Sequence, residues 1–321
     1  MSCQSNEDQN FWTAIQLQKV VEAMQYPYGE GPESIPPLRD EEGKWALIAV
    51  EKADLFAKVF QDKFHLPAST EIIDDTATLI DHGIFEHGFL LVRTRSVRKL
   101  LLKLSDGSAT GPDDLPSNIL KKCANELVYP ITKLVRLILR EGIWPSSWKL
   151  HWLLPLFKRK SRSVPNNYRG IHLTSQLSKV GERVIGNLLL PRLQRTEKFG
   201  PHQFAYCQGR SYKDALTLCV CEWILALSSN CRIGLYCSDV AGAFDKVSSE
   251  RLKNELAVLG IHENIFHTLC SWLEPRSAHV IVDNKASHHF SLKDMLYQST
   301  VLGPPLWNIF YADARRAVNQ A

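Results

Sequence analysis

The sequence lacks the features that mark several broad classes of protein. Its eight cysteines form no Cys-x-x-Cys pair, which argues against a zinc ribbon or a disulfide scaffold and favours reduced thiols. No apolar run approaches the roughly 18–20 residues that a membrane-spanning helix needs, so we expect no membrane contact. The first residues lack the basic and then apolar stretches of a secretory signal. With no internal repeat or low-complexity tract either, these absences favour a protein of the nucleus or cytoplasm.

Charge is unevenly spread along the chain, so that each sign is scarce in one segment. The 321 residues carry a formal net charge of only +4. Residues 1–90 contain 6 basic and 16 acidic side chains, whereas residues 147–215 contain 13 basic and 3 acidic ones. Such a basic segment can bind a polyanion such as nucleic acid, or it can be a solvated surface. Charge alone favours neither interpretation.

Hydrophobic periodicity separates a helical N-terminal region from a longer mixed region. Apolar residues at helical spacing predict helices over residues 11–24 and 46–64. A linker rich in proline and glycine separates them over residues 26–42, and an acidic, turn-rich stretch follows to residue 88. We therefore distinguish a helical and linker region, residues 1–91, from a domain over residues 92–321.

The domain over residues 92–321 combines helices with short strands. The short apolar run 233–239 predicts its most clearly buried strand, which ends on Asp239. Because strands and helices do not alternate regularly, the pattern indicates an α+β fold. Two hairpins are predicted, from strands 152–157 with 166–173 and 278–282 with 288–292. Helices are predicted over residues 92–104, 117–127, 131–140, 176–194, 212–227, 250–259 and 264–272.

The carboxylate of Asp239 is the first candidate for chemistry. A buried strand that ends on an aspartate can present an oxygen ligand to a hard cation. The small residues 241–243 leave room for a bulky ligand beside the backbone, and Phe244 would form a wall of that pocket. Strand-ending aspartates more often cap the turn or helix that follows, and this segment alone favours the capping interpretation.

Several motifs in a fixed order make the assignment more specific. The segment DVAGAFD at residues 239–245 resembles the first palm motif of reverse transcriptases, and QSTVLGPPLW at residues 298–307 resembles the second. TGPDDLP at residues 110–116 is similar to the loop that opens these domains in non-LTR retrotransposons. The other matches follow the family's order: WK at 148–149, PLFKRK at 155–160, NYRGIHLTS at 167–175, KVGERVI at 179–185, QFAY at 203–206 and GRS at 209–211.

The chain therefore resembles the reverse transcriptase domain of a non-LTR (LINE-type) retrotransposon over residues 92–321. The segment EKADLFAKVF at residues 51–60 is similar to the one that precedes this domain. The resemblance implies an RNA-directed DNA polymerase with a right-hand fold, of which the chain holds the fingers and part of the palm after a helical N-terminal segment. It also implies an RNA template, a DNA primer and deoxynucleoside triphosphates as partners. The oligomeric state is unknown from the sequence.

The same resemblance implies a metal site. Asp239 would be the catalytic carboxylate and would ligate two Mg²⁺ ions, one of which the Val240 carbonyl would join. Two ions about 3.5–4 Å apart stabilise the attacking and leaving oxygens of nucleotidyl transfer. The family's second metal-binding carboxylate comes from an aromatic-x-Asp-Asp hairpin, expected beyond Ala321, because Asp313 has no paired aspartate and is predicted to be a helix residue. We expect a two-metal site that is incomplete in this truncated copy and no polymerase activity from the chain alone.

The resemblance also assigns residues to the incoming nucleotide. Lys158 and Arg169 would hold the triphosphate, the lysine as a point charge and the arginine as a planar fork. Phe244 would pack beneath the deoxyribose, and Gln298 would line the pocket near the incoming base or template. Simpler interpretations stay open: a solvated turn for Lys158, core packing for Phe244 and backbone hydrogen bonding for Gln298.

Two positions depart from the family pattern. Ser299 follows Gln298 where the family has glycine, and Gly170 follows Arg169 where it has proline. A glycine after Gln298 would allow a close backbone approach or a positive φ, and a serine side chain restricts both. Two alternatives to a retrotransposon polymerase stay open: a catalytically dead nucleic-acid-binding relic, and a polymerase of the group II intron maturase type.

Overall fold

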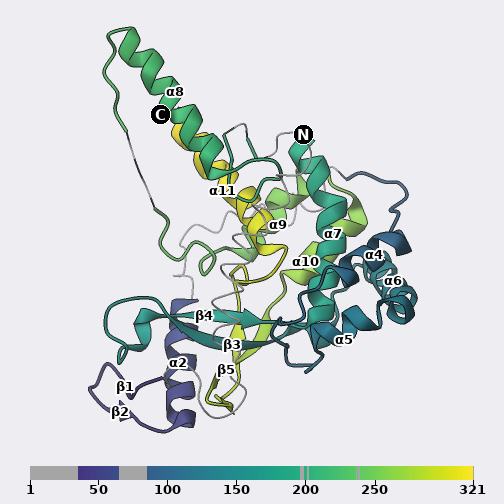
Figure 1. The fold of residues 1–321 in the computed structure, drawn as a ribbon, viewed down its shortest axis with the longest axis vertical. Helices are drawn as coiled ribbons and strands as arrows, with labels where there is room; N and C mark the ends of the chain where they lie inside the picture. Colours follow the sequence, from purple (N-terminus) through teal and green to yellow (C-terminus); the bar gives the residue numbers. More distant parts are fainter. Residues whose placement is uncertain are drawn as a thin grey trace.

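The computed structural model describes residues 35–64, 85–195, 199–200, 202–235, 237 and 239–320. These residues combine a mixed β-sheet with helices, which confirms the predicted α+β class (Figure 1). The helix predicted over residues 11–24 lies outside the described residues. Within the described ranges, no helix is both long and apolar enough to cross a bilayer.

A five-stranded sheet joins segments that are far apart in the sequence. Strands β3 and β4 form the predicted antiparallel hairpin, with Leu156 opposite Arg169. Strand β3 also pairs in parallel with β5, but only as far as Leu153, two residues before Pro155, which has no N–H to extend a ladder. The strand order is β4-β3-β5-β6, with β7 paired to β5. The strands are β1 (Leu38–Arg39) and β2 (Trp45–Ala46), which form a separate pair, and β3 (Leu150–Phe157), β4 (Tyr168–Leu173), β5 (Arg276–Val282), β6 (Lys285–Ala286) and β7 (Phe290–Leu292).

Most described helices fall where periodicity predicts them. In Figure 1, α4, α5 and α6 gather beside α7 and α10 at one end of the sheet, while α2 crosses the β3–β4 hairpin. Asp313 lies in α11, as predicted for a helix residue. The helices are α2 (Ala49–Lys63), α4 (Thr94–Leu102), α5 (Ser117–Lys122), α6 (Ala124–Glu141), η1 (Ser146–Lys149), η2 (Pro165–Asn167), α7 (Gln176–Arg195), α8 (Tyr212–Ser228), α9 (Ser249–Ala257), α10 (Glu263–Trp272) and α11 (Gly303–Gln320).

One predicted helix break is wrong. Helix α6 continues through Pro130, and the chain breaks instead at Cys123, between α5 and α6. Proline removes one hydrogen bond within a helix, but burial of Ile131, Val135 and other apolar side chains of α6 stabilises the helix around it. The helix ends, as predicted, at Gly142, whose φ of +67° is the left-handed conformation that glycine adopts readily.

Helix α2 packs closely against the sheet. Its buried Phe56 and Phe60 lie one turn apart, and the Phe56 ring meets the ring of Tyr168 edge-on with centroids 4.9 Å apart. A Cβ at Gly170 would lie 3.3 Å from a Phe60 ring carbon and 3.1 Å from Leu153. The absence of a side chain at Gly170 therefore allows α2 to approach β4.

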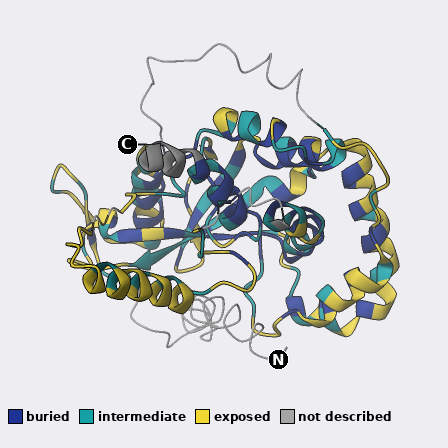
Figure 2. Cartoon of the chain, turned by 90° about the horizontal axis from the view of Figure 1, so that it is seen from above, coloured by how far each residue is buried: buried dark blue, intermediate teal, exposed yellow. Residues whose placement is uncertain are grey.

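The buried strand predicted over residues 233–239 is not found in the residues of this range that the structure describes. Residues 231–235 have no strand structure, and Ile233 and Leu235 are exposed. A strand needs a partner for its N–H and C=O groups, and within the described ranges no strand pairs with this segment. The preceding helix α8 is present as predicted but has no buried residue, and it stands apart from the rest of the fold (Figures 1 and 2).

Candidate functional site

Three of the predicted site residues converge on the carboxylate of Asp245. Gln298, in the loop before α11, donates a hydrogen bond from Nε2 to Asp245 Oδ1 at 2.8 Å. Lys158 directly follows β3, and Arg169 lies in β4. Both cations are close enough to Asp245 for their charges to act on its pKa. The hairpin and the loop before α11 therefore meet at one place.

The environment of Asp245 is unusual for a surface carboxylate. Burial raises the pKa of the Asp245 carboxyl, and the Gln298 hydrogen bond and the nearby cations act in the opposite direction. Among the described residues, neither Lys158 nor Arg169 makes a direct ion pair with Asp245. Asp245 also does not cap a helix, because α9 is capped by the Ser248 hydroxyl instead.

Lys63, the last residue of α2, is a member of this site that sequence patterns did not indicate. Its Nζ donates to the main-chain carbonyls of Asn166 at 3.0 Å and Tyr168 at 3.2 Å. Burial lowers the pKa of Lys63, while the Asp245 charge raises it and the Lys158 charge lowers it. Lys63 lies just after the segment EKADLFAKVF, which ends at residue 60, and no motif of the resemblance includes it.

Glu182 of α7 anchors the loop that carries Gln298. The Glu182 side chain is fully buried. The Glu182 carboxylate accepts hydrogen bonds from the main-chain N–H groups of Val301 at 2.6 Å and Leu302 at 3.3 Å. It also accepts from Trp272 Nε1 at 3.3 Å. The segment KVGERVI, matched in the sequence as a helix of the family but given no role, thus supplies the anchor for the second palm-like motif.

Ser299 has the backbone conformation that the family's glycine would favour. Its φ is +69°, in the left-handed region that residues with a Cβ rarely adopt. The serine side chain therefore does not prevent the turn but strains it. The departure from the family pattern at Ser299 therefore lies at a position where glycine has a physical advantage.

A buried polar network connects the hairpin, β5 and the same loop. Nδ1 of His151 and Nδ1 of His172 are 3.0 Å apart, and Arg276 Nη1 lies 2.9 Å from His151 Nε2. Because arginine can only donate, His151 Nε2 accepts, and the His151 proton lies on Nδ1 and is donated to His172. The His172 proton then lies on Nε2, which has no hydrogen-bond partner within the described part of the chain.

Both imidazoles of this network are held neutral. Burial, with the Arg276 charge next, lowers the pKa of His151 well below its usual range and that of His172 to about 3. The Arg276 guanidinium stacks over the rings of Trp272 at 4.6 Å and Tyr297 at 4.2 Å. Tyr297 directly precedes Gln298, so the network fixes the loop at the residue next to Gln298.

Phe244 packs against α11. Its ring stacks on Trp307 with centroids 5.9 Å apart and an interplanar angle of 22°. The main-chain carbonyl of Phe244 accepts a hydrogen bond from Leu296 N at 2.8 Å. Phe244 is therefore half-buried beside the loop of Gln298, and a role beneath the sugar stays a prediction.

Asp239 and Val240 lie apart from these contacts. Both are exposed, and the turn after them places Gly242 at φ +65° with its carbonyl accepting from Asp245 N at 2.9 Å. Across the described residues, no three His, Cys, Asp or Glu side chains are grouped so that they could hold a metal ion. Asp239 is exposed and belongs to no such group among the described residues, which does not fit a two-metal site.

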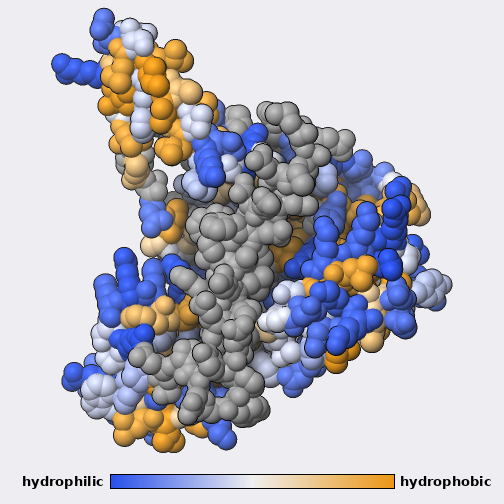
Figure 3. Space-filling view, in the orientation of Figure 1, coloured by the Kyte–Doolittle hydropathy of each residue, from blue (hydrophilic) through white to orange (hydrophobic). Residues whose placement is uncertain are grey.

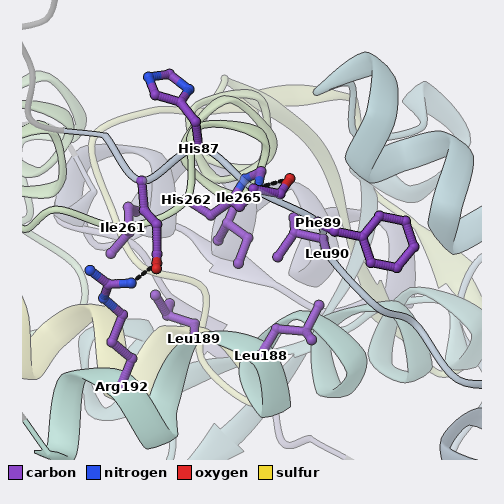
Figure 4. Close-up of a pocket in the computed structure, with 11 residues that line it drawn as sticks. His87, Phe89, Leu90, Leu188, Leu189, Arg192, Ile261, His262 and Ile265 are labelled. Atoms are coloured by element: carbon purple, nitrogen blue, oxygen red, sulfur yellow. Dashed lines mark hydrogen bonds and ion pairs between the residues drawn. The ribbon is translucent and has the colours of Figure 1, made fainter.

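Two hollows elsewhere flank residues 86–92. The smaller, a cavity of about 140 Å³, lies between this segment, α7 and α10 (Figure 4). Beside it Arg192 pairs with Glu86, and His262 Nε2 donates to the carbonyl of Gly88 at 3.1 Å. None of the predicted site residues lines either hollow. These contacts fasten segment 86–92 to the helices.

Comparison with known protein families agrees with the motif order. A family model described as reverse transcriptase (RNA-dependent DNA polymerase) matches residues 158–321, half of the chain. The match begins at Lys158 and includes Arg169, Glu182, Asp245 and the loop before α11.

Curated relatives extend the similarity upstream. A probable RNA-directed DNA polymerase from transposon BS of Drosophila melanogaster is 27% identical over 281 residues, which cover 86% of this chain and 31% of the relative. The RNA-directed DNA polymerase from mobile element jockey of the same species is 24% identical over 282 residues, covering 86% and 30%. A retrovirus-related Pol polyprotein from the type-1 retrotransposable element R1 of Bradysia coprophila is 31% identical over 154 residues, covering 47% and 15%. The chain thus spans about a third of the length of the first two relatives.

Proposed function

The chain belongs to the reverse transcriptase family, and from that premise we propose that it forms the nucleotide-binding part of a retrotransposon RNA-directed DNA polymerase. The β3–β4 hairpin corresponds to the fingers, and residues 239–245 with the loop before α11 correspond to part of the palm. RNA template, DNA primer and deoxynucleoside triphosphates are the proposed ligands. The observation that carries the proposal is the convergence of Lys158, Arg169 and Gln298 on Asp245.

The chemistry of these side chains suits a triphosphate. Lys158, directly after β3, and Arg169, in β4, supply positively charged hydrogen-bond donors from one hairpin, and the Lys158 N–H bond to the Asn167 carbonyl closes the hairpin between them. Gln298 is held by Asp245 and by the loop that Glu182 anchors, so its amide is preorganised rather than mobile. Phe244, beside this loop, is the candidate contact for the sugar.

The Mg²⁺ ligands that we propose in this chain are the Asp239 carboxylate and the Val240 carbonyl. Among the described residues, no three His, Cys, Asp or Glu side chains are grouped to hold a metal ion, and we derive no catalytic step from Asp239. We therefore expect the 321-residue chain by itself to bind nucleotide without extending a primer on an RNA template. The localisation we propose is the nucleus or cytoplasm.

The test is equilibrium binding of dTTP to the purified chain, measured by titration calorimetry. Lys158→Met and Arg169→Met should each weaken binding by roughly ten- to a hundredfold, the effect of losing one charge-assisted hydrogen bond. Lys133→Met, on the exposed side of α6, is the matched control and should leave affinity unchanged. Undetectable dTTP binding, or equal effects of all three substitutions, would overturn the proposal.

A second candidate is a nucleic-acid-binding protein without catalysis, favoured by the exposure of every residue from Lys158 to Arg162. Alanine at Lys158, Arg159, Lys160 and Arg162 should flatten the log–log salt dependence of duplex binding by up to about 3–4 units, if each neutralises one phosphate. Flattening together with undetectable dTTP binding would favour this second function.

A further inference from the structure

Helix α2 ends inside the candidate site although it lies upstream of the segment that the family model matches. Its last turn is fixed by Phe60, which packs on Gly170, and by Phe64, whose ring stacks on that of Phe60 with centroids 6.0 Å apart. The position of Lys63 between these residues is therefore set by core packing. Its side chain is directed to the turn between β3 and β4.

The ammonium group of Lys63 makes two hydrogen bonds and keeps one further N–H donor. A lysine carries three N–H donors, and two of them meet the carbonyls of Asn166 and Tyr168. Among the described residues, no acceptor is recorded for the third donor, and no carboxylate makes an ion pair with Lys63. One donor is thus available to a ligand at the mouth of the hairpin.

The charges around this donor are unbalanced. Lys63, Lys158 and Arg169, which we call the cation cluster, all act on the single carboxylate of Asp245. Gln298 already occupies Oδ1 of that carboxylate. Three positive charges therefore face one negative charge, and the half-buried Lys63 loses hydration without gaining a direct counter-ion. A polyanionic ligand would supply the missing charge.

We propose that Lys63 is a third basic ligand of the incoming nucleotide's triphosphate, acting with Lys158 and Arg169. This inference rests on the proposed function, because it assumes that the cation cluster binds a nucleotide. It adds a residue from the N-terminal region to a site otherwise built from the matched segment. The competing explanation is that Lys63 only braces the hairpin through its two carbonyl contacts.

The two explanations differ in what can replace the lysine. Lys63→Arg keeps the charge and the donors, whereas Lys63→Gln keeps a donor for one carbonyl but loses the charge. Lys58, exposed on the same helix, offers the matched control Lys58→Gln. We would measure dTTP affinity by calorimetry and the melting temperature of each variant in the same buffer.

Phosphate binding predicts that Lys63→Gln weakens dTTP affinity at least about tenfold, while Lys63→Arg and Lys58→Gln stay within about threefold of the original protein. The salt dependence of dTTP binding should also become shallower in Lys63→Gln. Unchanged dTTP affinity in a folded Lys63→Gln variant would overturn the inference. So would a loss of affinity in Lys63→Arg as large as that in Lys63→Gln.

Failure of the inference is distinguishable from failure of the proposed function. If Lys158→Met weakens dTTP binding and Lys63→Gln does not, only the inference is wrong. If neither the original chain nor any variant binds dTTP, the proposed function is wrong and the inference with it. Should Lys63→Gln fail to fold, Lys63→Met at a temperature below its melting point is compared with Lys63→Arg on the same criteria.

Discussion

The β3–β4 hairpin and the segment 231–242 both carry family-like motifs, but they differ in how the rest of the chain supports them. The hairpin pairs with β5, is covered by α2 and is joined to Lys63 through two hydrogen bonds. The segment 231–242 follows α8, whose apolar side chains stand on the surface (Figure 3), and Leu235 is 67% exposed. A motif forms a defined site only where segments distant in sequence pack on it.

The contrast extends to the two predicted sets of ligands. Of the predicted nucleotide ligands, Lys158, Arg169 and Gln298 lie around Asp245, and Phe244 packs on Trp307 beside the loop of Gln298. The metal set, Asp239 and Val240, comes from the unsupported region and stays exposed.

Glu182→Ala should lower the free energy of unfolding by about 3–5 kcal/mol. The substitution leaves the N–H groups of Trp272, Val301 and Leu302 without their acceptor in the interior. Urea unfolding followed by circular dichroism measures the change. Glu250→Ala, exposed on α9, is the control and should stay within about 0.5 kcal/mol. Equal midpoints for the two variants would contradict the anchoring role.

Stability should fall as the pH decreases from about 6.5 toward about 3. The folded protein holds His172 neutral down to a pKa of about 3, whereas the unfolded chain takes up the proton near its ordinary pKa of about 6.5. The stabilisation is therefore fully present above pH 6.5 and is lost below it, by up to about 1.4 kcal/mol per pH unit for this residue. Urea unfolding at several pH values measures the slope.

The control for this pH dependence is His172→Gln, whose amide oxygen can still accept from His151 but does not titrate. Its slope should be shallower by about the contribution of one histidine. An identical slope in both proteins would show that other groups, and not the network of His151, His172 and Arg276, govern acid unfolding.

Ser299→Gly should raise the free energy of unfolding by roughly 0.5–1 kcal/mol. Glycine relieves the positive φ at this position, and the greater freedom of the unfolded chain offsets part of the gain. Ser229→Gly is the matched control, because Ser229 has an ordinary φ of −91° and should gain no stability. Thermal unfolding of both variants provides the comparison, and a gain shared by both would argue against strain at Ser299.

Leu225→Ala should change stability by less than about 0.5 kcal/mol, the smallest effect. Leu225 on α8 is 68% exposed, whereas Leu153 in β3 is fully buried. Truncation of a buried leucine costs about 2–5 kcal/mol, so Leu153→Ala is the reference. If the two substitutions destabilise the chain equally in urea, α8 is packed and the contrast between the regions is lost.

Local sequence pattern predicted much of this fold and named three of the residues that lie around Asp245. Helices α4, α7 and α10 and the β3–β4 hairpin fall at their predicted positions, because hydrophobic periodicity and turn residues act over a few neighbouring positions. The break expected before Ile131 was wrong because burial of the helix face outweighed a local proline effect. Among the site residues, Lys158, Arg169 and Gln298 were predicted from motif order, and the structure brings them together.

The sequence by itself determined the family, through the order of its motifs, and the type of most local elements. Only the tertiary structure decided that Asp245 is the centre of the cluster, that Lys63 joins it from α2 and that Glu182 anchors the loop of Gln298. It also decided that residues 231–235 form no strand. The physical reason is the same in each case: hydrogen-bond pairing and charge clustering depend on segments far apart in the chain, which periodicity does not encode.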